Sequence, residues 1–221
     1  GLRRRRALLA RARRVLTVLV ANTKGGCGKT TTATQLASAF ARAGLATALA
    51  DADRQRSSLG WLARRPASAA PVRGLDWTKG PGKPPAVERL VVDAPAALKR
   101  GGLEDLVDRA DVVLVPLLPS AFDETATATL TAKLAALKPV RKGKTPVGVV
   151  ANRLKPRSRA TQRLEAFCAA LDQPVAGRVA DRAAYADLAL DGLGVFDLAG
   201  ARAKSWREDW LAVVAFCEAQ A

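Results

Sequence analysis

The sequence of 221 residues contains no histidine and no methionine, and it has only three cysteines. Without histidine the chain lacks the commonest general base and zinc ligand, so any chemistry must use lysines, carboxylates, a bound ion or main-chain dipoles. Cys27, Cys168 and Cys217 lie far apart and are odd in number, which excludes a disulfide framework and a C-x-x-C metal pair and favours a reducing compartment. Because no apolar run reaches roughly 18 residues, no transmembrane helix is expected.

Acidic residues are scarce relative to basic ones, and the net charge is +16. Seven of the positive charges are arginines within residues 1–14, where no acid occurs, and the remainder still carries +9. A basic globular part favours a polyanionic partner, with nucleic acid ahead of an anionic membrane surface, although such charge can also serve colloidal stability alone. Residues 1–14 are expected to form a basic arm, disordered or not native, that acts on DNA, at a membrane surface or as an organelle presequence.

Apolar, β-branched runs alternate with alanine-rich stretches through residues 15–221. This alternation predicts a single α/β domain with a mostly parallel, twisted sheet of about six to eight strands and helices on both faces. We expect strands at 15–21, 45–50, 72–77, 90–93, 111–116, 147–151 and 175–179, and helices at 30–43, 58–65, 103–109, 122–137, 158–171, 182–190 and 203–219. Because ligands in such sheets bind beyond the carboxyl ends of the strands, polar residues that follow strands should converge on one rim.

A glycine-rich segment follows the first expected strand and ends in Gly28-Lys29-Thr30. A strand that stops in such a turn and restarts as a helix directs unpaired backbone N–H groups and a positive dipole end at one point, where a phosphate can sit. The Lys29 ammonium suits β and γ phosphates, and the Thr30 hydroxyl suits Mg²⁺. The strict pattern G-x-x-x-x-G-K-[ST] fails, however, because Thr23 stands at its first glycine and Lys24 follows. A glycine-rich turn with two solvated lysines is the alternative.

The run Lys24-Gly25-Gly26-Cys27-Gly28-Lys29-Thr30 resembles the deviant P-loop of the ParA/MinD group of ATPases. The resemblance covers most of the chain from Val15 onward and implies a P-loop NTPase domain over residues 15–221. It implies that Lys29 holds the β and γ phosphates, and that Lys24 reaches across a dimer interface to the partner subunit's phosphates. The residues implied to bind ATP in the loop are Gly25, Gly26, Cys27, Gly28, Lys29, Thr30 and Thr31.

Three aspartates follow expected strands. Asp93, at the end of Val91-Val92-Asp93, is similar to a Walker B carboxylate that holds Mg²⁺ directly or through a water, with a helix cap as the alternative. The run from Asp51 to Gln55 resembles the family's D-x-D-P-Q element, with arginine in place of proline. The resemblance implies that Asp53 positions the attacking water and that Asp51 lies near the metal's water shell, which makes Thr30, Asp51 and Asp93 the candidate Mg²⁺ ligands. Two turn-forming aspartates are the alternative.

Further candidate contacts lie toward the carboxyl end. Asn152 matches an asparagine that related enzymes place against the adenine edge, and a strand-end turn is nearly as good an interpretation. Sequence-independent phosphate binding needs only a basic patch and no base-reading helix. Trp206 and Trp210, four apart in one expected helix, are assigned to the core. The candidate DNA contacts are Arg153, Lys155, Arg182, Lys204 and Arg207, with Arg157, Arg159 and Arg202 beside them.

The resemblance is closest to the short ParA-like partition ATPases and implies a switch driven by ATP and Mg²⁺. Two subunits enclose two ATP molecules, the homodimer binds double-stranded DNA without sequence preference, and a ParB-like or cargo-adaptor protein stimulates hydrolysis. Such a cycle segregates or positions plasmids, chromosomes or protein cargo over the nucleoid, in the cytoplasm. A MinD-like membrane switch is one alternative, although residues 211–221 are apolar and weakly acidic and leave only residues 1–14 for a membrane. A dethiobiotin-synthetase-like ligase is another, whereas an iron–sulfur carrier would need clustered cysteines.

Overall fold

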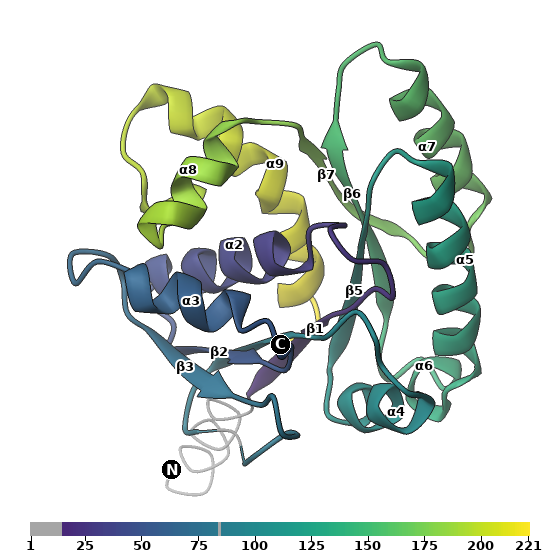
Figure 1. Cartoon of the computed structure of the whole chain (residues 1–221), viewed down its shortest axis with the longest axis horizontal. Coiled ribbons are helices and arrows are strands. Elements are labelled where there is room, and N and C mark those ends of the chain that lie inside the picture. The colour runs from purple at the N-terminus through teal and green to yellow at the C-terminus, as the bar shows by residue number, and fades with distance from the viewer. Residues whose placement is uncertain (1–14, 84) are drawn as a thin grey trace, which may run out of the picture.

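The computed structural model describes residues 15–83 and 85–221, so the expected arm at 1–14 lies outside the described residues. One sheet of seven parallel strands crosses the molecule in the order β3-β2-β4-β1-β5-β6-β7 (Figure 1). This confirms the expected α/β fold with a parallel sheet. The strands are β1 (Leu16–Val20), β2 (Thr47–Asp51), β3 (Val72–Asp76), β4 (Arg89–Asp93), β5 (Val112–Leu117), β6 (Val147–Leu154) and β7 (Val175–Ala180).

Helices cover both faces of the sheet, and β1 shows why. Its side chains alternate, so Leu16, Val18 and Val20 pack with α2, α3, α8 and α9, whereas Leu19 packs with α4 and α5 on the other face. No helix in residues 15–83 or 85–221 is both long and apolar enough to cross a membrane. The helices are α2 (Lys29–Arg42), α3 (Ser57–Arg64), α4 (Arg100–Asp108), α5 (Ala121–Ala136), α6 (Lys138–Arg141), α7 (Arg159–Ala170), α8 (Ala184–Asp191), α9 (Ala201–Glu218) and the short 3₁₀ helix η1 (Val195–Asp197).

The order of the strands fixes where a ligand can bind. β1 lies between β4 and β5, and the chain builds β2, β3 and β4 on one side of it before crossing to β5, β6 and β7 on the other. The strand order therefore reverses at β1, and in open parallel sheets the crevice beyond the carboxyl ends of the strands at such a reversal is the ligand site. The segment 21–28 emerges from β1 at that point.

Most boundaries agree with the sequence-based expectations to within a few residues, and the differences have local causes. The expected strand at 147–151 continues to Leu154 with two register shifts against β7, and Arg153 in this stretch adopts φ 52°. Asn152-Arg153 lacks the apolar alternation of a strand, so the sequence gives no sign of the extension. Helix α6, with four residues, and η1, with three, were not expected. Both are too short for apolar residues to recur at helical spacing, so the sequence shows no periodic pattern there.

The core contains the tryptophan pair largely as expected. Trp210 is fully buried, its indole N–H donates to the Tyr185 hydroxyl at 2.9 Å, and the two rings meet edge to face. Trp206 is half-buried against the same cluster. Trp206 and Trp210 therefore secure α9 to the sheet rather than forming stacking platforms on the surface.

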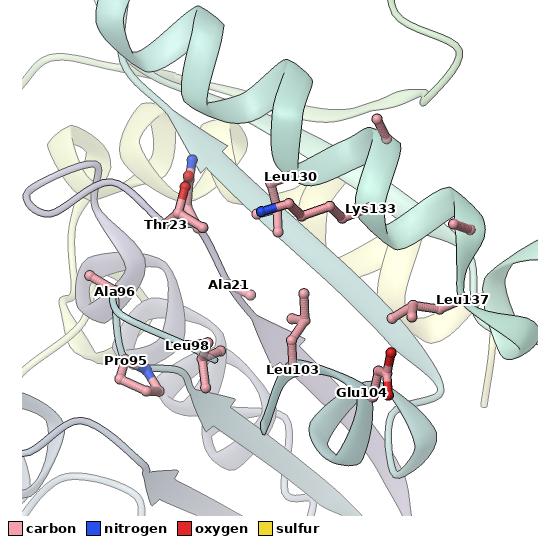
Figure 2. A pocket seen from close by; sticks show the side chains of 13 residues that line it. Ala21, Thr23, Pro95, Ala96, Leu98, Leu103, Glu104, Leu130, Lys133 and Leu137 are labelled. Atoms are coloured by element: carbon pink, nitrogen blue, oxygen red, sulfur yellow. The ribbon is translucent and has the colours of Figure 1, made fainter. Parts of the chain in front are cut away.

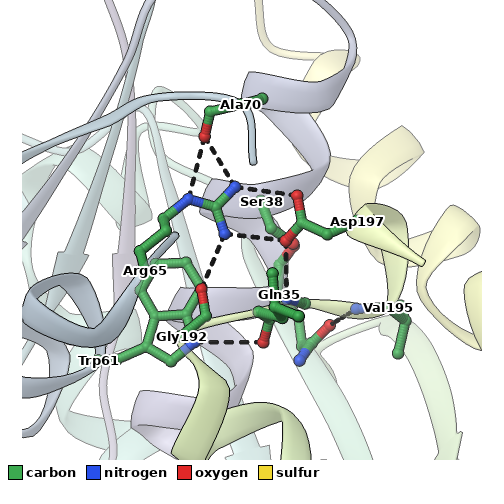
Figure 3. Close-up of polar contacts among 10 residues, drawn as sticks. Gln35, Ser38, Trp61, Arg65, Ala70, Gly192, Val195 and Asp197 are labelled. Carbon is green, nitrogen blue, oxygen red and sulfur yellow. Dashed lines mark hydrogen bonds and ion pairs between the residues drawn. The ribbon is translucent and has the colours of Figure 1, made fainter. Parts of the chain in front are cut away.

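A buried ion pair fixes the C-terminal end of α3 (Figure 3). Arg65 donates through both Nη atoms to Asp197 at 2.8 and 2.9 Å, and its remaining N–H groups reach the carbonyls of Ala70 and Gly192. All five guanidinium donors are therefore used. Trp61 adds a hydrogen bond from its indole to the carbonyl of Leu193 and lies under the guanidinium, 4.9 Å from ring centroid to Cζ. These contacts hold α3 against α8 and η1.

Candidate functional site

The glycine-rich loop turns from β1 into α2 with two glycines in the left-handed region. Gly26 has φ 76°, and Gly28, directly before α2, has φ 97°. A Cβ at Gly28 would also clash with the side-chain amide of Asn152, so this position requires glycine for two separate reasons. The loop therefore exposes its backbone at the N-terminal end of α2, which is the geometry expected for a phosphate cradle.

The two lysines of the loop differ in burial. Lys29 is buried, and its ammonium donates to the backbone carbonyl of Lys24 at 2.9 Å and lies 3.9 Å from the Cys27 thiol sulfur. Lys24 is exposed, and its backbone N–H donates to Asn22 Oδ1 at 3.2 Å. An ammonium has three N–H donors, so Lys29 can meet a phosphate without leaving the loop.

The carboxylate of Asp93 contacts Thr30, one of the two other residues expected at a magnesium site. Its Oδ2 atom accepts hydrogen bonds from Thr30 Oγ1 and from Ser58 Oγ, both at 2.7 Å. Burial raises the pKa of Asp93 to about 6, against the lowering effect of these two hydroxyls. Among the described residues, no hydrogen bond reaches its Oδ1 atom. One carboxylate and one hydroxyl are hard oxygen donors of the kind that Mg²⁺ accepts alongside phosphates.

These donors fit magnesium only together with a nucleotide. Within residues 15–83 and 85–221, no group of three histidine, cysteine or acidic side chains could hold a metal alone. Mg²⁺ is commonly bound by one or two carboxylates plus substrate phosphates, so the Asp93 and Thr30 pair agrees with that mode. Ser58, which contacts the same carboxylate, was missed by sequence reasoning because a serine in the first turn of a helix is an ordinary surface residue.

Asp51 and Asp53 lie on the same rim but have different environments. Asp51 is fully buried, and its two carboxylate oxygens each accept a backbone N–H, from Asp53 and from Leu59 of α3, at 3.0 Å. Burial raises its pKa, against those hydrogen bonds. Asp53 is half-buried, and its Oδ1 accepts the backbone N–H of Gln55. Asp51 thus fixes the start of α3, while Asp53 is the more accessible carboxylate; the metal and water roles remain predictions.

Asn152 supports the glycine-rich loop from the end of β6. Its side-chain amide donates to the Cys27 carbonyl at 3.3 Å, and its Oδ1 accepts the backbone N–H of Arg153. The side chain is buried. This contact places it next to the loop, and its expected contact with adenine stays a prediction.

The candidate DNA contacts lie on adjoining elements, where some are held by internal partners. Lys155 pairs with Asp181 at 3.6 Å, Arg182 pairs with Asp209 at 2.9 Å, and Arg207 donates to the carbonyl of Leu198 at 2.7 Å. The Arg182 pair joins the end of β7 to α9. By contrast, five candidates are exposed and have no ion pair within the described part of the chain: Arg153, Arg157, Arg159, Arg202 and Lys204.

A cavity of about 500 Å³ lies beside this rim, between the start of the loop and helices α4 and α5 (Figure 2). Its lining is mainly apolar, and Figure 2 shows the ammonium end of Lys133 extending from α5 toward it. The cavity touches the site through Thr23 and through Pro95, which follows the Asp93 strand. None of Lys24 to Thr31 lines it, so the phosphate cradle is a separate feature.

This arrangement of fold and loop defines a class of nucleotide-binding protein. The chain matches the family described as CobQ/CobB/MinD/ParA nucleotide binding domain over residues 18–195, and it belongs to that family. The expected resemblance to the ParA/MinD group is thereby confirmed.

Among curated proteins, the chain is similar to maintenance of carboxysome distribution protein A from Halothiobacillus neapolitanus, at 32% identity over 202 residues, covering 87% of this chain and 91% of that protein. Among solved structures, a plasmid partition protein from Borrelia burgdorferi with bound AMPPNP has a TM-score of 0.71 at 15% identity, covering 92% of this chain and 100% of that one. A variant McdA from Cyanothece in complex with ATP has a TM-score of 0.69 at 16% identity, covering 93% and 96%.

Proposed function

We propose that this protein is a ParA-like ATPase that pairs with a second copy when both bind ATP and Mg²⁺, binds DNA without sequence preference, and positions a cargo. The observation that carries this proposal is the pair of lysines on one loop beside the Thr30–Asp93 contact. Lys29 is buried within the loop, whereas Lys24 is exposed. An exposed lysine on a phosphate loop suits a contact with another subunit's nucleotide.

The residues of the loop would divide the work on the triphosphate. Backbone N–H groups of residues 25–31 and the α2 dipole hold the phosphates, and Lys29 neutralises the β and γ oxygens. Thr30 and Asp93 would hold Mg²⁺, which would supply positive charge that neutralises the phosphates. Lys24 of the opposite copy adds positive charge where it develops in the transition state.

Hydrolysis needs an oriented water more than a strong base. Asp53 is placed for this role, because it is half-buried at the rim and its Oδ1 is already fixed by the N–H of Gln55. Asp51 holds the loop before α3, so it keeps Asp53 in place. Slow hydrolysis by this set, stimulated by a partner protein of the ParB or cargo-adaptor type, would reset the dimer.

Nonspecific DNA binding would use the exposed arginines in the last residues of β6 and just after it, and the basic start of α9. Arg153, Arg157 and Lys204 are exposed without ion pairs among the described residues, so their charges are available to phosphates. Such binding depends on released counterions and weakens steeply with salt. We therefore propose that the protein lies in the cytoplasm, associated with the nucleoid.

The cargo is proposed from the named relatives. The relative from Halothiobacillus neapolitanus is named for carboxysome distribution, and it aligns over most of both chains. A large protein body of that kind is therefore our first candidate, ahead of a plasmid, which the name of the Borrelia burgdorferi structure suggests.

The proposal is tested by DNA retention across a salt titration with Mg²⁺ and either ATP or ADP. We expect retention with ATP only. The logarithm of the DNA-binding constant should fall linearly with the logarithm of the salt concentration. Lys29→Ala should lose nucleotide binding, whereas Lys24→Ala should keep it and lose pairing and DNA retention. Lys79→Ala, at an exposed lysine shortly after β3, is the matched control. Equal retention with both nucleotides would refute the switch.

A further inference from the structure

Phe122 stands out on the surface of the described residues. Its side chain is 80% exposed, more than the other exposed large apolar residues, Leu190 and Leu211. It lies in the first turn of α5, and Ser120 is the N-cap of that helix. A single exposed apolar residue is normal on a protein surface, so the exposure alone carries no conclusion.

The second observation is what Phe122 faces. The ammonium nitrogen of Lys24 lies 5.9 Å from the centroid of the Phe122 ring, within the range of a cation–π contact. The backbone of Lys24 is held on both sides, since its N–H donates to Asn22 and its carbonyl accepts from Lys29. Among the described residues no carboxylate pairs with the Lys24 ammonium. The ring is therefore the contact that orients this side chain.

The backbone that carries the ring is fixed by its neighbours. Asp123, the next residue, is buried, and its carboxylate and backbone N–H both bond to Ser120. The side-chain amide of Asn22, which precedes the glycine-rich loop, donates to the Thr127 hydroxyl of α5 at 3.2 Å, so this helix lies against the start of the loop. A buried neighbour thus holds Phe122 on the rim of the phosphate site, facing solvent.

We propose that Phe122 is a positioning residue for Lys24 and a contact of the interface between two nucleotide-bound copies of this chain. The inference rests on the proposed function, in which Lys24 reaches the other copy's phosphates. In the single subunit the ring holds the ammonium at the rim, and on pairing the ring is buried by the second copy while the ammonium passes to the phosphates. The occupant is a second copy because the residue that the ring orients is the one that crosses between subunits.

The test is sedimentation of the full chain with Mg²⁺ and AMPPNP, comparing four variants with the wild type. We expect Phe122→Ala to weaken pairing on the order of tenfold relative to the wild type, and Phe122→Leu to weaken it less. Phe122→Trp should pair as well as the wild type, since tryptophan gives the strongest cation–π contact. Calorimetric AMPPNP affinity of the single subunit and the thermal midpoint should be unchanged, because the ring is exposed and touches none of the groups proposed to hold its own subunit's phosphates. Leu190→Ala is the control, a comparably exposed apolar residue on α8.

The outcomes separate this inference from the proposed function. If the wild type pairs and Phe122→Ala pairs equally well, or if Leu190→Ala weakens pairing as much, the inference is wrong and the proposed function stands. If Phe122→Leu pairs as well as the wild type while Phe122→Trp does not, the ring acts only as apolar surface and its positioning role is refuted. A wild type that stays single with AMPPNP refutes both.

Discussion

The two ends of helix α3 carry two buried polar clusters that look alike and differ in how completely they are satisfied. At the C-terminal end, Arg65 uses all five donors on Asp197 and three carbonyl contacts. At the N-terminal end, Ser58 and Thr30 share one oxygen of Asp93, and the pKa of that carboxyl is raised to about 6. A saturated cluster has nothing left for a ligand, whereas the Asp93 cluster retains acceptor capacity.

This difference separates structural from functional burial. An ion pair whose donors are all used at hydrogen-bond distance offsets its desolvation and fixes geometry, which is what Arg65 does between α3, α8 and η1. A buried carboxylate that is only partly compensated is held at a cost to folding, and such residues cluster where chemistry or ligand binding occurs. Helix α3 therefore joins a rigid anchor to the proposed nucleotide site.

Removing the anchor should have the largest effect. Arg65→Ala leaves Asp197 buried without its partner, and we expect the free energy of unfolding in urea to fall by about 3–5 kcal/mol. The double variant Arg65→Met with Asp197→Leu should recover much of that loss, because it removes both charges. A single variant that loses under about 1 kcal/mol would show that the pair is not structural.

The Asp93 cluster should make the stability of the protein depend on pH. The pKa of Asp93 in the folded protein, about 6, lies above its ordinary value of 3.8, so at a pH between these values the folded state binds a proton that the unfolded state has lost. Stability should therefore fall as the pH rises from about 4 to about 6 and level off above, by roughly 3 kcal/mol. Urea titrations without Mg²⁺ check this, and Asp93→Asn should abolish this part of the pH dependence. An unchanged slope in that variant would show that Asp93 is not the group responsible.

Sequence reasoning found the parts of this site that follow from local pattern. Gly28-Lys29-Thr30 after an apolar strand, and Asp93 at the end of another, are recognisable because strand ends meet on one rim. It missed contacts between segments distant in the chain. Arg65 and Asp197 are 132 positions apart, and the Ser58 contact with Asp93 spans 35. No local period marks such partners, because their selection depends on how α3 packs.

The sequence also left open which of two interpretations applies at Asp51 and Asn152. Asp51 bonds two backbone N–H groups at the start of α3, as a turn-forming aspartate would. Asn152 bonds the carbonyl of Cys27 and is buried next to the exposed Arg153 in the extension of β6 past residue 151. These contacts depend on three-dimensional placement, and both residues retain the capacity for the ligand roles expected of them.

The smallest expected effect concerns the single hydroxyl by which α3 contacts the Asp93 cluster. Ser58→Ala removes one of the two hydrogen bonds that lower the pKa of Asp93, so that pKa should move further above 6. Binding of Mg²⁺ with ATP should then weaken a few-fold at pH 6, corresponding to about 1 kcal/mol, and much less at pH 8, where the carboxyl is ionised in both proteins.

Ser57→Ala is the matched control, because Ser57 is the exposed neighbour in the same turn of α3. It should leave calorimetric affinity unchanged at both pH values, and Ser58→Thr, which keeps a hydroxyl, should restore most of the affinity lost at pH 6. A loss in Ser58→Ala that is equal at pH 6 and pH 8 would mean that Ser58 acts through the shape of α3 rather than through the ionisation of Asp93. In that case the N-terminal cluster would be structural in the same sense as the Arg65 anchor.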